Sequence, residues 1–199
     1  MAGAGGPDPG RRSERSRSAI LTATYELISE VGYGKLSIEA IAARAGVGKQ
    51  TIYRWWPSKG AVVFDALAAL SEGADGDITL PDTGDLAADL RTVLRATVAE
   101  FADPAFEAPI RALNLEIIND PELARTYRDR MEQPIKAAKL DRLRSAQQVG
   151  QLPPDADLEL ILDLLYAPIT QRWLMRSGPL DAAFADALVD AVLRAFAPD

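Results

Sequence analysis

The sequence predicts an all-α protein, with an N-terminal three-helix domain that contains a helix-turn-helix and a C-terminal domain of longer helices. Apolar residues recur at helical spacing along most of the chain, and no strand-like alternation of apolar and polar residues is present. Two short helical segments flank a glycine turn within residues 37–59. Stretches rich in glycine and proline separate the predicted helices. Together these observations favour a chain of helices without a sheet.

The first predicted helix covers residues 13–31 and ends at Gly32. Residues 1–12 are rich in glycine, proline and alanine and lack periodicity, so we expect a disordered arm there. The inward-facing side of the helix carries Ile20, Thr24, Leu27, Ile28 and Val31.

Residues 37–59 begin with a helix that has clear start and stop signals. Ser37 can accept a hydrogen bond from a free amide of the first turn, where the helix dipole also favours the carboxylate of Glu39. Gly46 ends this helix, because glycine adopts the left-handed conformation without steric cost. The inward face of the helix carries Ile38, Ile41, Ala42 and Ala45.

A second short helix follows over residues 49–56 and stops before Pro57, which cannot continue a helix. Ile52 faces inward, whereas polar side chains remain on the outside. This layout is that of a helix-turn-helix, whose second helix enters the DNA major groove. The outward-facing residues are Lys49, Gln50, Thr51, Tyr53 and Arg54.

The rest of the chain predicts further helices. The first, residues 59–72, is apolar on most sides, and residues 73–84 form a loop that marks a domain boundary. Pro109, Pro134 and Pro168 fall inside later helices, where we expect kinks or breaks. The later helices cover residues 85–102, 104–119, 121–149, 155–177 and 181–197.

Composition excludes several classes of protein. The chain contains neither cysteine nor histidine, which excludes disulfides, metal sites built from these residues and histidine-based acid–base catalysis. Since no nucleophile or phosphate-binding motif is present either, we expect no metal, no cofactor and no enzymatic activity. No apolar run has membrane-spanning length and the N-terminus lacks a secretory pattern, so we expect a cytoplasmic protein without membrane association.

Charge is distributed unevenly along the chain, whose formal net charge is −7. Residues 1–60 hold nine basic and five acidic residues, a net charge of +4, and the remainder holds 13 basic and 24 acidic residues, a net charge of −11. A basic N-terminal part on an acidic body is typical of local phosphate binding.

The motif A-x-x-A-G-V-x-x-x-T-I-Y-x-x-W-x-S-K, within residues 37–59 and preceded by a helix that ends V-G-Y-G, resembles the TetR (tetracycline-repressor-like) family. The resemblance is close over the first third of the chain. The remainder resembles the family only in consisting of several amphipathic helices. It implies a sequence-specific transcriptional regulator, more often a repressor than an activator, that a small-molecule ligand releases from its operator. An alternative is a DNA-binding or protein-docking regulator without a small-molecule effector.

The implied domains are a disordered arm (1–12), a helix-turn-helix domain (13–60), a connecting helix and loop (61–84), and a helical regulatory and dimerisation domain (85–199).

Particular residues are candidates for contact with double-stranded operator DNA. Lys49 and Gln50, at the start of the second helix, can hydrogen-bond base edges, although each could also be a solvated surface residue. Lys59 lies at a helix N-terminus, which favours a phosphate. The resemblance implies backbone contacts for Thr51 and Tyr53. The full candidate set is Ser37, Lys49, Gln50, Thr51, Tyr53, Arg54, Trp55 and Lys59.

Two of the expected roles have structural alternatives. The role of Ser37 could be helix capping alone. The arginine cluster within residues 11–17 could reach a groove or a phosphate as a flexible arm, or could be a solvated tail.

Operator binding by one such motif reads a single half-site, so we expect a homodimer through the last two helices. Each helix carries an apolar stripe, which could instead close the core of the monomer. The stripes are Leu158, Ile161, Leu162, Leu165 and Ile169 in the first helix and Phe184, Leu188, Val192, Leu193 and Phe196 in the second.

The resemblance places a cavity for an unidentified effector among the middle helices. Asn114 shares a helical face with apolar residues, so its amide needs a partner, which a ligand, a water molecule or an internal hydrogen bond could supply. Aromatic residues at helical spacing could equally be core. The candidate pocket residues are Phe106, Asn114, Tyr127, Met131, Tyr166 and Trp173.

Overall fold

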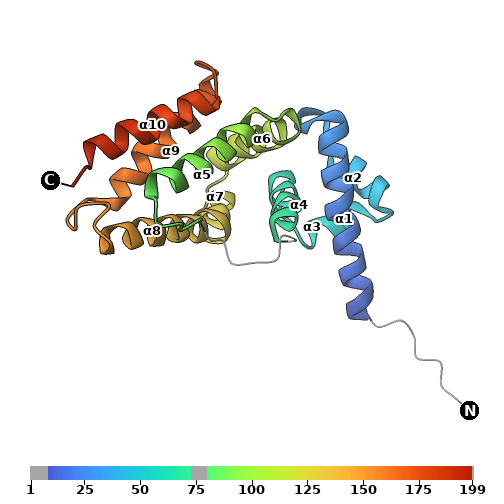
Figure 1. Cartoon of the computed structure of the whole chain (residues 1–199). Coiled ribbons are helices and arrows are strands. Elements are labelled where there is room, and N and C mark those ends of the chain that lie inside the picture. Colours follow the sequence, from blue (N-terminus) through green and yellow to red (C-terminus); the bar gives the residue numbers. More distant parts are fainter. Residues whose placement is uncertain (1–8, 73–79, 199) are drawn as a thin grey trace, which may run out of the picture. The chain divides into compact units, whose positions relative to one another are not determined.

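The computed structural model describes residues 9–72 and 80–198, and within them every regular element is helical (Figure 1). The contacts divide the chain into two compact units. The first unit consists of Met1–Asp75 and Ala108–Tyr127, and the second of Gly76–Glu107 and Arg128–Asp199. The sequence predicts residues 108–127 as part of the C-terminal domain, whereas their contacts group them with the helix-turn-helix.

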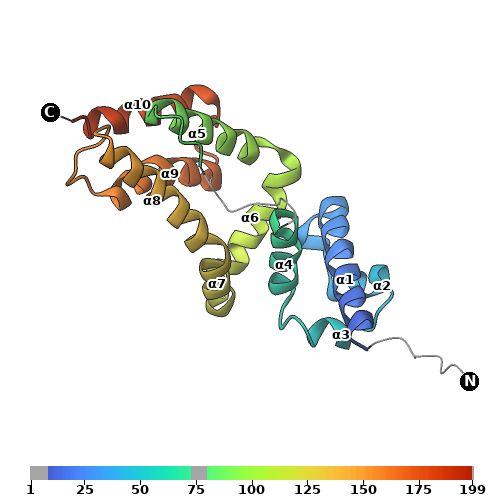
Figure 2. The same cartoon turned by 60° about the horizontal axis from the view of Figure 1, so that its bottom comes forward.

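The first unit is built around one long helix, α1, against which α2 and α4 both pack, while α3 packs on α2 (Figures 1 and 2). α4 also contacts α7. The fully buried side chains of Ile41 and Ile52 join the two short helices to this core. The elements are α1 (Pro9–Val31), η1 (Tyr33–Lys35), α2 (Ile38–Ala45), α3 (Lys49–Tyr53), α4 (Lys59–Glu72), most of α6 (Pro104–Asn119) and α7 (Pro121–Tyr127).

Two expectations for the first unit were wrong in detail. α1 begins at Pro9, so residues 9–12 are helical and not disordered, because proline suits the first helical position and arginine favours helix. Residues 1–8 lie outside the described residues. α3 ends at Tyr53 and not at residue 56. The residue before Pro57 is disfavoured in the helical conformation, and the chain turns so that Trp56 is buried.

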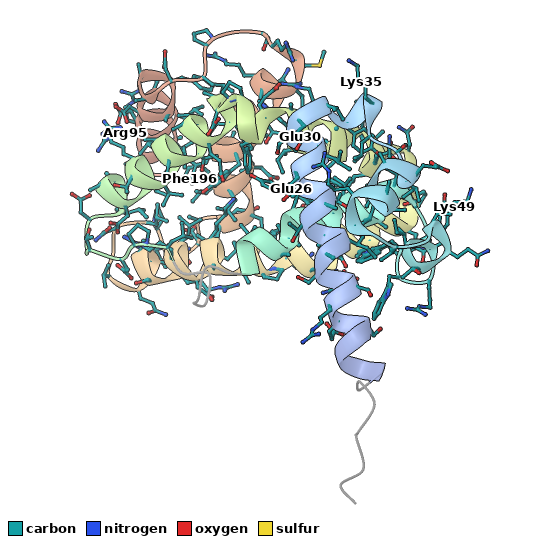
Figure 3. The ribbon with its side chains drawn as sticks, turned by 90° about the vertical axis from the view of Figure 1, so that its right-hand side faces the viewer. Glu26, Glu30, Lys35, Lys49, Arg95 and Phe196 are labelled. Carbon is teal, nitrogen blue, oxygen red and sulfur yellow. The ribbon has the colours of Figure 1, made fainter. Side chains whose placement is uncertain are left out.

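The second unit packs α5 against α10 and places α9 beside both α8 and α10 (Figures 1 and 2). Two ion pairs join α5 to α10: Arg91 to Asp190 at 2.5 Å, and Arg95, labelled in Figure 3, to Asp186 at 2.6 Å. The elements are α5 (Leu86–Ala102), η2 (Arg128–Glu132), α8 (Gln133–Gln148), α9 (Leu158–Met175) and α10 (Ala182–Ala195).

The apolar stripes of α9 and α10 serve mainly the core of this unit. Ile161, Leu165 and Ile169 are fully buried in the single chain, and Phe184 and Phe196 pack against the same cluster. The monomer core therefore uses the residues that we expected at a dimer face, which is the alternative that the sequence left open.

Three helices of the second unit begin at aspartate caps, although α9 starts at Leu158 and not at the predicted residue 155. Asp85, Asp157 and Asp181 each cap the helix that follows by accepting backbone N–H groups. The predicted helix 121–149 is interrupted at η2, a π-helical turn directly before α8. Pro134 lacks the N–H that would complete the hydrogen bond to the turn before it, which accounts for the break. α6 and α9 continue through Pro109 and Pro168.

None of the helices within residues 9–72 and 80–198 is long and apolar enough to cross a membrane.

Candidate nucleic-acid interface

The turn between α2 and α3 has the geometry that the sequence indicated. The hydroxyl of Ser37 accepts a hydrogen bond from the Ala40 amide at 3.1 Å, which caps α2. Gly46 ends α2 in the left-handed conformation, with φ of 67°. The Val47 amide then donates to the Ala42 carbonyl at 2.9 Å. These hydrogen bonds satisfy both ends of a helix of only two turns and fix the direction in which the chain enters α3.

α3 presents a polar row to the outside. Ile52 is fully buried, whereas Lys49 and Gln50 are exposed and Tyr53 keeps 52% of its surface accessible. Thr51 is half-buried. A five-residue helix has little stability of its own, so its position depends on the anchor at Ile52 and on the turn before it.

Lys49 is held only weakly. Its ammonium lies 3.7 Å from the Glu39 carboxylate, and both side chains are more than half exposed. Exposed pairs of this kind contribute little, so Lys49 is available to a stronger anion. Figure 3 shows the Lys49 side chain projecting away from α1, while Lys35 lies near the other end of this unit.

Lys59, at the start of α4, has a structural role that the sequence did not reveal. Its ammonium donates hydrogen bonds to the carbonyls of Tyr33 and Leu36, at 3.2 and 3.4 Å, and lies 3.8 Å from the centre of the Tyr33 ring. An ammonium has three N–H groups, so one donor remains for a further partner. Ser58 caps the same helix by accepting from the Ala61 amide.

The two neighbouring tryptophans have different environments. Trp56 is buried, and its indole N–H donates to Asp65 at 2.9 Å. Arg17, from the arginine cluster of α1, pairs with the same carboxylate at 3.2 Å. Trp55 is exposed, with the Arg54 guanidinium 5.9 Å from its ring centre. Trp56 and Arg17 therefore hold α1 and α4 together, and Trp55 and Arg54 remain on the surface.

Arg44 links α2 to α1. Its guanidinium pairs with Glu30 at 2.8 Å and with Glu26 at 3.3 Å, two residues one turn apart on α1 (Figure 3). The hydrogen bonds that Arg44 donates to Glu30 and Glu26 raise the pKa of Arg44, and the hydrogen bond from Arg44 lowers the pKa of Glu30. No periodic pattern in the sequence pairs Arg44 with these glutamates, because they lie on a different helix.

A polar groove runs beside α3, the second helix of the helix-turn-helix. It is lined from α1 by residues that include Ser13 and Arg15, and from α3 and its end by Thr51 and Arg54. Two arginines on the walls of one groove favour a polyanion over a neutral ligand.

The residues expected to line an effector pocket do not gather at one place. Asn114 and Tyr127 belong to the first unit, whereas the other four belong to the second. The Asn114 amide donates to the Ile110 carbonyl of its own helix at 2.9 Å. Trp173 is buried and stacks on Phe101, with ring centres 4.9 Å apart. Phe106 also stacks on Phe101, with ring centres 6.0 Å apart, and Met131 lies in η2.

Of those six, Tyr166 alone lines the small cavity of the second unit. The cavity has a volume of about 10 Å³ and lies among α5, α8 and α9. Its lining includes charged residues that the sequence analysis did not single out. They are Asp89 on α5 and Lys139 and Arg142 on α8.

These charged residues differ in whether they have a partner. Arg142 is buried and donates to the Asp89 carboxylate at 2.6 Å. Burial alone would raise the pKa of Asp89, but hydrogen bonds from Arg142 and Thr83 lower the pKa below its ordinary value. Lys139 instead lies over the ring of Tyr166, at 3.3 Å from its centre, and burial lowers its pKa to about 8. Burial also raises the pKa of Tyr166, so this phenol stays protonated.

Comparisons with known proteins cover both units. Residues 20–66 match the family model described as bacterial regulatory proteins, tetR family, and residues 80–192 match the model described as tetracyclin repressor-like, C-terminal domain. A relative in Bacillus subtilis (strain 168), the uncharacterized HTH-type transcriptional regulator YdeS, is 35% identical over 186 residues, which cover 93% of this chain and 90% of the relative.

Two further proteins are similar over most of the chain. The DNA-binding transcriptional repressor TetR of Mycobacteroides abscessus is 31% identical over 185 residues, 92% of this chain and 94% of its own. The crystal structure of the TetR family transcription regulator SCO0332 superposes with a TM-score of 0.73 at 34% identity, and covers 92% of this chain and 99% of that one.

Proposed function

This chain belongs to the TetR family of helix-turn-helix transcriptional regulators, and from that premise we propose that it is a repressor which binds its operator as a homodimer and leaves it when a small molecule binds. Relatives of this kind are DNA-binding regulators, which are not enzymes. The observation that carries the proposal is the exposed polar row of α3 above the fully buried Ile52.

The residues divide by the part of the DNA that they reach. We assign base contacts to Lys49 and Gln50, because the first residues of a recognition helix face the base edges. Thr51 and Tyr53 are assigned to backbone phosphates, with Arg54 and Trp55 at the edge of the contact. Ser37 acts first as a cap, so its share in DNA binding is the smaller one.

We propose that Lys59 both stabilises the fold and contacts a DNA phosphate. Two of its three N–H groups bind the carbonyls of Tyr33 and Leu36, and the third can donate to a phosphate. The N-terminus of α4 adds a favourable dipole at the same point.

The dimer is proposed to form through the outer faces of α9 and α10. On α9, Leu160, Leu164 and Met175 remain 46%, 41% and 71% exposed in the single chain, although the opposite face of the helix is buried. On α10, alanines at positions 183, 187 and 191 are exposed at intervals of four residues, so another helix can approach closely. A face of large apolar residues beside a face of small ones supports pairing with a second copy.

The operator is first defined by selecting bound sequences from random DNA. We then expect Lys59→Ala to weaken binding to all sequences and to reduce the salt dependence by about one unit of slope, the amount expected for one lost phosphate contact. Gln50→Ala should instead change the preference among operator variants.

Lys35→Ala is the matched control, since Lys35 carries the same charge on an exposed surface of the same unit. If Gln50→Ala lost affinity equally for every sequence, its role in base contact would be wrong. A regulator without an effector is the second candidate, and the competition of small molecules against a bound operator duplex separates the two.

A further inference from the structure

The cavity described in the second unit is lined by one ammonium group that forms no ion pair with any described residue. Arg142 pairs with Asp89 at 2.6 Å and with the half-exposed carboxylate of Asp82 at 3.6 Å, and it donates to the carbonyl of Pro81 at 3.0 Å. Thr83 donates to Asp89 through its amide and its hydroxyl, at 3.0 and 2.8 Å. The hydrogen bonds of Arg142 and Asp89 therefore lie within the fold, and Arg142 offers no unpaired positive charge to a ligand.

Lys139 has no such partner. Within the described residues no carboxylate pairs with its ammonium, and its contact is the face of the Tyr166 ring at 3.3 Å. Three residues earlier on the same helix, Lys136 keeps 38% of its side-chain surface accessible and pairs with Glu159 at 2.8 Å. The fold thus neutralises the outer lysine and leaves the inner lysine, in a partly dehydrated place, without an anion.

The other walls of the cavity are apolar and one more donor is present. Burial keeps the Tyr166 phenol protonated, and its hydroxyl makes no hydrogen bond within the described residues. A single ammonium and a single hydroxyl match one carboxylate better than a phosphate, which carries more charge and needs more donors. The apolar lining consists of Leu80, Pro81, Leu90, Val93, Leu143 and Leu162.

We propose that this cavity is the effector site and that it binds a small monocarboxylic acid with an apolar body, whose carboxylate pairs with Lys139 and Tyr166. The assignment of this ligand as effector rests on the proposed function, whereas its binding does not. The cavity of about 10 Å³ holds roughly one water molecule, so the ligand replaces the contact of Lys139 with the Tyr166 ring and displaces the Leu80–Pro81 wall.

Displacement of that wall has a consequence within the second unit. Leu80 to Thr83 is held by the Arg142–Asp89 pair through the Pro81 carbonyl and both donors of Thr83. The same chain segment follows α4 in sequence. A ligand that moves this segment therefore acts on a part of the chain that begins eight positions after the end of α4 in the sequence.

Calorimetric titration of the full chain without DNA tests the binding. The probes are benzoate, phenylacetate and hexanoate, each compared with its neutral amide. We expect at least one acid to bind more tightly than its amide, and Lys139→Met to weaken that acid about tenfold or more, since a hydrogen bond to a charged group is lost. Lys139→Arg should restore most of the affinity, and Lys136→Met, the matched control on the exposed side of α8, should leave it unchanged.

Binding of no acid in the series, equal binding of acid and amide, or an equal loss in Lys136→Met would overturn the proposal. Release of the operator duplex is measured separately with the acid that binds. An acid that binds through Lys139 but leaves the operator complex intact contradicts the effector role and leaves the site itself standing.

Discussion

At the scale of single residues, the environment of each buried charge decides its effect on stability. Asp89 is 3% exposed, yet it is ionised because Arg142 and Thr83 donate to its carboxylate. Removal of one member of such a pair leaves the other charge buried and uncompensated. Replacement of both by apolar side chains removes the desolvation penalty together with the attraction.

The first prediction concerns this pair. Asp89→Asn should lower the free energy of unfolding by about 3–5 kcal/mol, the usual cost of breaking a buried ion pair. The double variant Asp89→Leu with Arg142→Met should recover most of that loss. Urea unfolding followed by circular dichroism measures both values. A double variant as unstable as the single one would show that the pair itself stabilises the unit.

The pH dependence of the same variant has a defined sign. The folded-state pKa of Asp89 lies below 3.8, so its contribution is fully present above pH 3.8 and is lost as the pH falls further through the folded value. The difference in stability between the wild type and Asp89→Asn should therefore be constant above that pH and shrink below it. A stability difference that is the same above and below pH 3.8 would contradict the lowered pKa of Asp89.

Residue roles could be predicted from the sequence where their causes are local. Ser37 and Gly46 act through backbone groups within a few positions, and Ile52 follows from helical spacing, so all three were predicted correctly. Asp89 and Arg142 are 53 positions apart, and no periodic pattern pairs them. The second role of Lys59 likewise depends on carbonyls more than 20 positions away.

At the scale of the elements, the helix-turn-helix depends on how α2 ends. α3 has only five residues, so its orientation comes from the turn at Gly46 and from the burial of Ile52. Gly46 has a φ of 67°, and no atom outside its chain neighbours would lie within 4 Å of an added Cβ. Position 46 therefore requires glycine because of its backbone conformation, and not because a side chain would lack space.

A pair of glycine substitutions tests this point. Gly46→Ala should lower the free energy of unfolding by about 1–2 kcal/mol, because an L side chain in the left-handed region meets its own backbone. Gly48→Ala has the same open surroundings but an extended backbone, with φ of −77°. We expect a change within about 0.5 kcal/mol there. Urea unfolding measures both variants. Equal losses in the free energy of unfolding would mean that steric crowding, and not backbone conformation, causes the destabilisation.

The ends of a helix could be predicted from the sequence where a capping residue lies next to them in the chain. α4 and α5 have the predicted bounds to within one residue, because Ser58 and Asp85 act on adjacent backbone groups at their starts. The break at η2 was expected only as an effect of Pro134, and the residues that form the π-helical turn could not be specified. The end of α3 depends on the burial of Trp56 against Asp65, a tertiary contact that local signals do not contain.

At the scale of the whole molecule, the uneven charge and the exposed faces of α9 and α10 have complementary effects. The chain carries +4 in residues 1–60 and −11 in the remainder, so electrostatic attraction to DNA is confined to the part that contains α3. One copy offers one recognition helix. Affinity for an operator with two half-sites therefore depends on a second copy held in fixed register.

The outer face of α9 gives the last prediction. Leu164→Glu places a charge at a side chain that is 41% exposed in the single chain, so the helix content should be unchanged while a dimer through this face dissociates. Val149→Glu, at a 66% exposed position directly after α8, adds the same charge outside α9 and α10 and should remain dimeric.

Light scattering gives the mass of each variant, and mobility shifts on an operator duplex give its affinity. We expect the Leu164 variant to be monomeric and to bind a two-half-site operator about tenfold or more weakly than the Val149 variant, because the gain from linked binding is lost. A dimeric Leu164→Glu protein with unchanged operator affinity would mean that the copies associate through a different surface.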